Sequence, residues 1–168
     1  GFHADTHPPL PMLLYWALRH LCFGSPALVG LAVMGLNAAA VVPLHGLGRE
    51  LGGEEGGFAA AALWISTPLC AILGNAGVDS LVIPPLAFCL WALLRGLREG
   101  GEAAFLRAGA WLGLASLLSF GSSAALVFLG LLGLTLRWRR SPDLGTFAKA
   151  AALDWARFLA GWLAVQAA

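Results

Sequence analysis

Charged residues are scarce in this chain. Asp, Glu, Lys and Arg make up 11% of the 168 residues, whereas 59% are hydrophobic, and the mean hydropathy is +0.79. So few polar side chains are not enough to cover the surface of a soluble globule of this size. The composition therefore indicates an integral membrane protein, or a piece of one. The net charge of +1 gives no support to nucleic-acid binding.

Cysteine is also rare. The three cysteines, Cys22, Cys70 and Cys89, stand singly within apolar runs. A zinc site needs closely paired ligands, and a secreted disulfide scaffold needs a higher density of cysteine. We therefore interpret them as small buried hydrophobic residues.

The sequence lacks an ordinary start. Its first residue is Gly1 rather than Met, and no basic segment with a small-residue cleavage site precedes the first apolar run. We therefore expect the chain to begin inside a longer protein.

Long apolar runs, by contrast, are abundant. A helix needs about 20 predominantly apolar residues to cross a bilayer. The runs predict an all-α fold, a polytopic transmembrane helix bundle that forms one domain over residues 1–168. The expected spans are Ala27–Leu47, Phe58–Gly77, Ser80–Leu97, Phe105–Phe120, Ser122–Trp138 and Phe147–Val165.

A shorter apolar segment, Pro11–Phe23, precedes these spans. It carries Tyr15 and Trp16 near its start and Arg19 and His20 near its end. This length and these side chains predict a helix that lies at the membrane interface. Residues 1–10 are then an extracytoplasmic loop.

The third span contains two adjacent prolines, Pro84 and Pro85. Proline has no backbone N–H and kinks a helix, although membrane helices tolerate it where neighbours satisfy the freed carbonyls. We expect a bend at this point.

The basic residues indicate the orientation in the membrane. If the N-terminal segment lies outside, eight of the ten Lys and Arg residues fall in inside loops, and Arg19 and Arg157 are the exceptions. The positive-inside rule then places residues 1–10 and the turn from Asn75 to Asp79 on the extracytoplasmic side of a plasma (inner) membrane. The eight are Arg49, Arg95, Arg98, Arg107, Arg137, Arg139, Arg140 and Lys149.

Ionisable residues gather at two places on the expected outer side. In the first, His3, Asp5 and His7 alternate ahead of a proline-rich stretch that holds the chain extended. Such an alternation is typical of a solvated loop, and also of a weak divalent-metal site with imidazole and carboxylate ligands. Both interpretations stay open.

The second place is Asp79, where a span begins after a glycine-rich turn. A helix N-terminus stabilises the carboxylate, so the position is typical of an ordinary N-cap and is also compatible with a functional acid. The acidic residues of the inner loops, Glu50, Glu54, Glu55, Glu99 and Glu102, lie among arginines and indicate solvated charge pairs.

Three further polar or small-residue features predict packing. Asn37 and His45 lie within or at the end of the first span, where hydrogen bonds to a neighbouring helix are expected. The spacing from Gly109 to Gly113 lets helices approach closely.

The segment DTHPPLPMLLYWALRHLCFGSPAL resembles the region after the first large extracytoplasmic loop of polyprenyl-phosphate-dependent glycosyltransferases of the GT-C fold. This membrane family includes protein O-mannosyltransferases and lipid A aminoarabinose transferases. The family carries a His-Pro-Pro or Lys-Pro-Pro motif there, followed by a short aromatic-rich helix. The resemblance covers about the first 120 residues, in which Arg49 and Asp79 match the family's order of an arginine-containing loop and a helix that starts with Asp.

The resemblance implies transfer of a sugar from a polyprenyl-phosphate donor to a lipid, glycan or protein acceptor on the extracytoplasmic face. It gives His7 the position of the basic residue that contacts the lipid-linked phosphate, and Asp79 that of a carboxylate in the same cavity. We expect Asp5 and His3 near the rim. Binding through His7 would depend on pH, because imidazole titrates near neutrality and lysine does not.

The sequence departs from the family's pattern in two respects. The family's main catalytic acid lies upstream of the matching region, so we expect this fragment alone to be inactive. Many relatives place a lysine where Phe120 follows Ser119 here. The alternative function is a non-enzymatic transporter or accessory subunit, in which Asp79 and the proline pair mark a translocation path.

Overall fold

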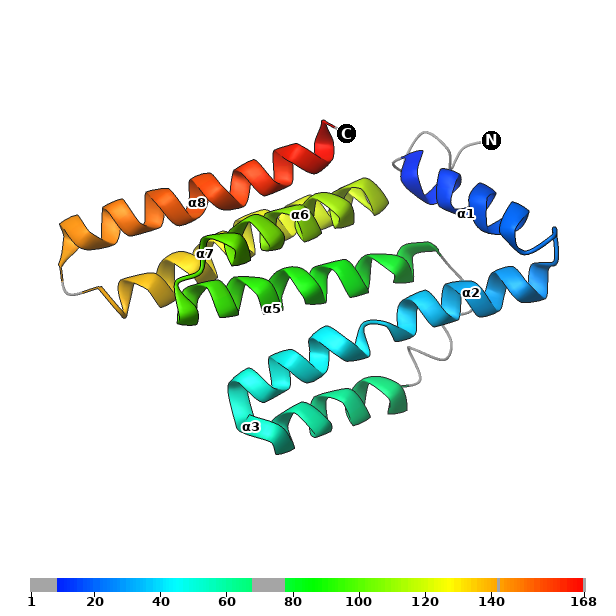
Figure 1. The fold of residues 1–168 in the computed structure, drawn as a ribbon, viewed down its shortest axis with the longest axis horizontal. Coiled ribbons are helices and arrows are strands. Elements are labelled where there is room, and N and C mark those ends of the chain that lie inside the picture. Colours follow the sequence, from blue (N-terminus) through cyan, green and yellow to red (C-terminus); the bar gives the residue numbers. More distant parts are fainter. Residues whose placement is uncertain (1–8, 68–77, 142, 168) are drawn as a thin grey trace.

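The computed structural model of the chain describes residues 9–67, 78–141 and 143–167 (Figure 1). These residues are almost entirely helical and contain no strand, which confirms the all-α prediction. The elements, with η for 3-10 helices, are α1 (Pro9–Leu21), α2 (Pro26–Ala38), α3 (Val41–Ser66), η1 (Val78–Val82), α5 (Ile83–Glu99), α6 (Glu102–Leu118), η2 (Phe120–Ser123), α7 (Ala124–Trp138) and α8 (Leu144–Gln166).

The chain reverses direction between α1 and α2 because of its local sequence. Phe23 and Gly24 adopt positive φ angles of 53° and 74°, and the Gly24 N–H donates to the Arg19 carbonyl at 2.7 Å. Ser25 then caps α2, and Pro26 occupies its first turn, where the missing N–H costs nothing. A helix separate from α2 is therefore present where the interfacial helix was expected, and its position at the membrane interface stays a prediction.

The element α3 is a hairpin of two helical arms. They meet at Gly52 and Gly53, and Gly53 has a φ of 69° that favours glycine. The arms approach so closely that a Cβ on Gly48 would lie 2.2 Å from the Gly56 carbonyl oxygen. The first arm continues the direction of α2, and the second returns beside it (Figure 1). The turn of the hairpin thus lies between Ala27–Leu47 and Phe58–Gly77, the first two expected spans.

The expected bend at the two prolines is absent. The helix α5 begins at Ile83, so Pro84 and Pro85 stand in its first turn and interrupt no hydrogen bond, and η1 precedes them. The prolines therefore start a helix rather than kink one. The other end of α5 is a left-handed Gly100 with a φ of 73°.

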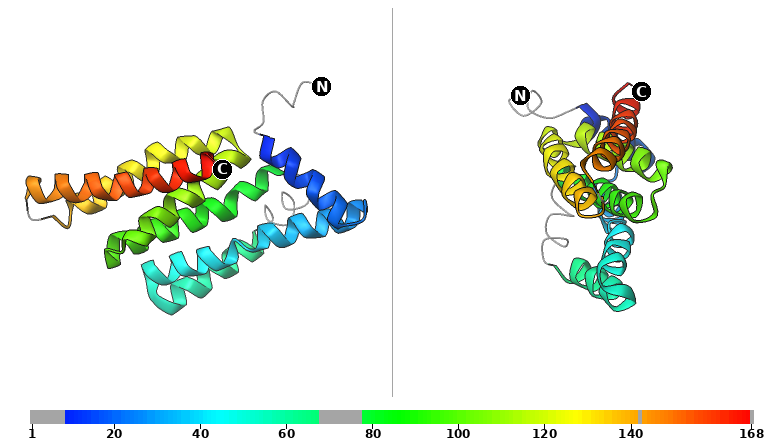
Figure 2. Two further views of the ribbon diagram at one scale, coloured as in Figure 1. Left: turned by 45° about the horizontal axis from the view of Figure 1, so that its top comes forward. Right: turned by 90° about the vertical axis from the view of Figure 1, so that its left-hand side faces the viewer.

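The helices α5, α6, α7 and α8 surround the main core. In Figures 1 and 2, α6 and α8 run side by side. Their closest approach depends on glycine, since a Cβ on Gly109 would lie 1.9 Å from the Phe158 carbonyl oxygen. This confirms that the small residues of α6 serve helix packing. The buried members of the core are Cys89, Leu93, Leu97, Phe105, Ala108, Leu112, Leu129 and Phe158.

Three helical stretches among the described residues are long and apolar enough to cross a membrane: Pro26–Ser66, Ser80–Glu99 and Phe120–Trp138. Two expected spans correspond to helices outside this set. The helix α6 has 17 residues, and α8 carries Lys149, Asp154 and Arg157 within its 23 residues. The count of about six spans stays a prediction.

Candidate functional site

One end of the bundle, which we call the α1 end, is assembled from α1, α2, η1 and the last turn of α6. Its buried core consists of Val29, Val33, Leu81, Val82, Ala115 and Leu118. Leu10, Leu14 and Leu18 of α1, and Cys22 just after it, pack against this core at four-residue spacing, and therefore from one face of the helix. The start of α1 and η1 thus share one apolar core.

The opposite face of α1 stays exposed. Met12, Leu13 and Trp16 are 64%, 58% and 62% exposed. The His20 ring lies beside Trp16, with 4.4 Å between ring centroids, and its Nδ1 is 2.8 Å from the Trp16 carbonyl oxygen. A helix with one face on protein and aromatic and aliphatic groups on the other is suited to the membrane interface.

The residues predicted to bind substrate or metal adjoin this end in the chain, before α1 and within η1. His3, Asp5 and His7 lie outside the described residues, and so does the proposed metal site that they form. The backbone of Asp79 lies in η1, and its side chain is not among the parts of the chain that the structure describes. The residue that caps α5 is Val82, so Asp79 is not the N-cap of that helix.

The departure at Ser119 and Phe120 also lies beside the α1 end. Ser119 terminates α6, and η2 begins at Phe120, whose side chain is 61% exposed. The Ser122 hydroxyl donates to the Ser119 carbonyl at 2.6 Å and holds the turn. Phe120 therefore stands two residues after Leu118, a member of the core at this end.

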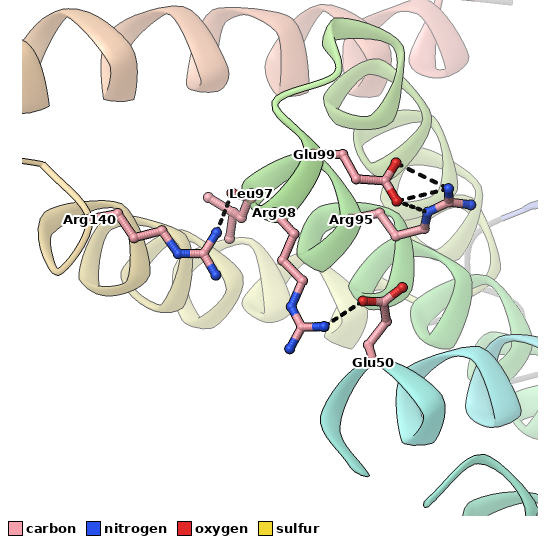
Figure 3. Close-up of polar contacts among 6 residues, drawn as sticks. All are labelled: Glu50, Arg95, Leu97, Arg98, Glu99 and Arg140. Carbon is pink, nitrogen blue, oxygen red and sulfur yellow. Dashed lines mark hydrogen bonds and ion pairs between the residues drawn. The ribbon is translucent and has the colours of Figure 1, made fainter. Parts of the chain in front are cut away.

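The other end of the bundle, which we call the ion-pair end, contains paired charges. Arg98 donates to Glu50 at 2.7 Å and links α5 to α3 (Figure 3). Arg95 donates to Glu99 through Nε and Nη2 at 3.1 and 3.0 Å, and Arg140 donates to the Leu97 carbonyl. These contacts confirm that Glu50 and Glu99, two of the acids predicted to form charge pairs, pair with arginine.

Two more pairs at this end were not predicted from the sequence. Arg137 Nε lies 3.3 Å from Asp154 Oδ2, with side chains 26% and 11% exposed, and Arg157 pairs with Glu102. The second pair places Arg157 at the end where most basic residues lie, so it is no exception to the charge pattern. The signal available in the sequence was Asp154, the single acid within the largely apolar segment that forms α8.

Asn37 and His45 were predicted to form hydrogen bonds with a neighbouring helix. Asn37 is buried at 3% exposure, and its Oδ1 accepts no hydrogen bond from a described residue, so its predicted hydrogen bond stays a prediction. His45 packs edge-on against Phe58, with 5.3 Å between ring centroids. No group of three or more His, Cys, Asp or Glu residues capable of holding a metal occurs in the described part of the chain.

Comparison with known proteins supports the resemblance. The family model described as dolichyl-phosphate-mannose-protein mannosyltransferase matches residues 6–153. That range includes His7, Asp79, α1 and the α1-end core. No curated protein matches, and no solved structure does. Since the match covers most of its length, the chain belongs to the dolichyl-phosphate-mannose-protein mannosyltransferase family.

Proposed function

We infer that the chain takes part in transferring a sugar from a polyprenyl-phosphate donor to a lipid, glycan or protein acceptor on the extracytoplasmic face of the plasma (inner) membrane. Membership of a mannosyltransferase family supports the glycosyltransferase class. The donor, the face and the residues that act are our proposal.

The observation that carries this proposal is that α1 and η1 pack on one apolar core. Leu10 packs against the core that contains Leu81 and Val82. His7 stands three residues before Leu10, and Asp79 two residues before Leu81. Three residues reach at most about 10 Å, so the proposal places both side chains beside this core.

Each residue has a role that its chemistry suits. His7, when protonated, attracts the phosphate that joins sugar to lipid and stabilises the charge that this phosphate gains as the glycosidic bond breaks. Asp79 lines the same cavity and accepts hydrogen bonds from sugar or acceptor hydroxyl groups. Asp5 and His3 stand at the rim, where a divalent metal ion is an optional partner.

The test compares His7→Ala, His7→Lys and Asp79→Asn in the intact protein, in vesicles supplied with a radiolabelled polyprenyl-phosphate sugar. We expect His7→Ala and Asp79→Asn each to lower sugar transfer at least about tenfold, the loss of one charged hydrogen bond. His7→Lys keeps transfer at neutral pH and maintains it at pH values where the wild type declines.

His20→Ala is the matched control, since His20 lies on the exposed side of α1 and contacts Trp16. All variants must reach the membrane in equal amounts, as judged by immunodetection of the membrane fraction. Wild-type transfer rates in His7→Ala and Asp79→Asn would overturn the site.

A transporter is the competing function, and the structure weakens the argument for it. A translocation path needs an interrupted helix near the middle of the membrane, yet Pro84 and Pro85 begin α5 without interrupting it. Substrate-dependent ion uptake into vesicles that lack sugar transfer would favour the transporter.

A further inference from the structure

A groove of about 370 Å³ lies between α5 and α6, away from the α1 end. Its main side chains are Phe88, Trp91, Arg95 and Glu99 from α5, with Arg107 and Trp111 from α6. The proposed sugar transfer does not use this groove, although Ala92 and Trp111 of its lining also pack against the main core.

The deeper part of the groove is aromatic. The rings of Phe88 and Trp111 stack across the two helices, with centroids 4.5 Å apart and an interplanar angle of 15°. The guanidinium of Arg95 lies over Trp91, 5.9 Å from its ring centroid. These rings offer a flat apolar wall to a bound molecule.

The outer part of the groove is cationic. Two arginines and one carboxylate line this part. The Nε and Nη2 groups of Arg95 already donate hydrogen bonds to Glu99. Arg107 is exposed and forms no ion pair with any described residue. The groove therefore carries an excess positive charge that is centred on a guanidinium with free donors.

The two helices present these groups in the same order. From Phe88 to Arg95 is about 10 Å along α5, and from Trp111 to Arg107 about 6 Å along α6. Both sequences run from rings inside the bundle to arginines near the ends of the helices, and α5 belongs to the membrane-spanning candidate Ser80–Glu99. This gradient matches a lipid, whose phosphate lies at the membrane surface and whose chains lie deeper.

We propose that the α5–α6 groove binds the phosphate of an anionic phospholipid, with Arg107 as its principal partner and the Phe88–Trp111 stack against the lipid backbone. Guanidinium donors match phosphate oxygens in pairs and are common in such sites. A free phosphate ion shares the anionic chemistry but makes no use of the aromatic wall.

The experiment is native mass spectrometry of the intact purified protein titrated with phosphatidylglycerol or with phosphatidylcholine of the same acyl chains. Arg107→Gln is expected to weaken phosphatidylglycerol binding about tenfold, and Arg107→Lys to restore most of it. Arg139→Gln is the matched control, since Arg139 is also exposed near the ion-pair end but lies outside the groove. Its binding should change less than about twofold.

Two further experiments distinguish a phospholipid from a free phosphate as the bound ligand. Inorganic phosphate and glycerol phosphate, at concentrations that match the lipid, should not displace phosphatidylglycerol, and a photoreactive phosphatidylglycerol should label peptides of α5 and α6. Displacement by either small anion would overturn the lipid assignment. Equal losses in Arg107→Gln and Arg139→Gln, or labelling elsewhere, would overturn the site. Each variant must unfold at the wild-type temperature in phosphatidylcholine, so that a folding defect is recognised.

Discussion

The two ends of this helix bundle use their residues differently. At the ion-pair end, arginines and acids from different helices neutralise one another, as with Arg98 and Glu50 or Arg137 and Asp154. At the α1 end, an apolar core joins the helices and no ion pair occurs among the described residues, and the residues assigned to substrate adjoin this core in the chain. The comparison teaches that charge holds the helices in register at one end, whereas at the other an apolar core supports the segments that we propose bind substrate.

The largest expected effect comes from breaking the least exposed pair at the ion-pair end. Asp154→Ala leaves Arg137 without its partner, and the free energy of unfolding should fall by about 3 kcal/mol. Thermal unfolding in detergent measures the loss. The double variant Asp154→Ala, Arg137→Leu should recover much of it, because no uncompensated charge remains; a double variant less stable than the single would contradict this role.

The next largest effect on stability concerns the packing of α6 against α8. Gly109→Ala places a methyl group against the Phe158 carbonyl, whereas Gly133→Ala meets nothing within 4 Å. The first should destabilise the protein by about 2 kcal/mol through overpacking. The second should be neutral or slightly stabilising, since alanine favours helix. Equal melting temperatures for the two variants would show that α6 and α8 are less tightly packed than described.

A smaller effect on stability sharpens the contrast at the α1 end. Leu14 packs on the α1-end core, and Leu13 is 58% exposed on the other face. Leu14→Ala should lower the free energy of unfolding by about 1 kcal/mol, because it truncates a half-buried side chain. It should also reduce sugar transfer by more than this loss of stability accounts for, since α1 then packs less tightly on the α1-end core. Leu13→Ala should change neither. Transfer assays beside thermal unfolding, with both variants at equal membrane abundance, distinguish the outcomes.

The smallest effect lies at the start of α8. The Thr146 hydroxyl and backbone N–H donate to Asp143 at 2.6 and 2.9 Å and hold the pKa of Asp143 below its ordinary value. This cap is complete above the ordinary aspartate pKa and is lost as the pH falls through the lowered one. Asp143→Ala should speed amide exchange in the first turn of α8 at neutral pH only; faster exchange throughout α8 would indicate a wider role.

The sequence predicted much of the fold. Apolar runs located the helices, and the turn at Gly52 and Gly53 falls between the first two expected spans, Ala27–Leu47 and Phe58–Gly77. The role of Pro84 and Pro85 was wrong because a proline kinks a helix only if the helix begins well before it. The pairs Arg137–Asp154 and Glu102–Arg157 depend on which helices are neighbours, which a single sequence does not reveal. Of the site, the sequence predicted His7 and Asp79, and the structure adds that Leu10 packs against the α1-end core, to which Leu81 and Val82 of η1 belong.

The most direct test of the difference between the two ends is photo-crosslinking of a polyprenyl-phosphate sugar that carries a photoreactive group next to its phosphate. The intact protein is labelled in excess phosphatidylglycerol, which occupies the α5–α6 groove, and the labelled peptides are mapped by mass spectrometry. We predict labels on the segment around His7 and the start of α1, and on η1 around Asp79. Labels confined to the ion-pair end, unchanged in His7→Ala, would contradict the assignment of substrate to the α1 end.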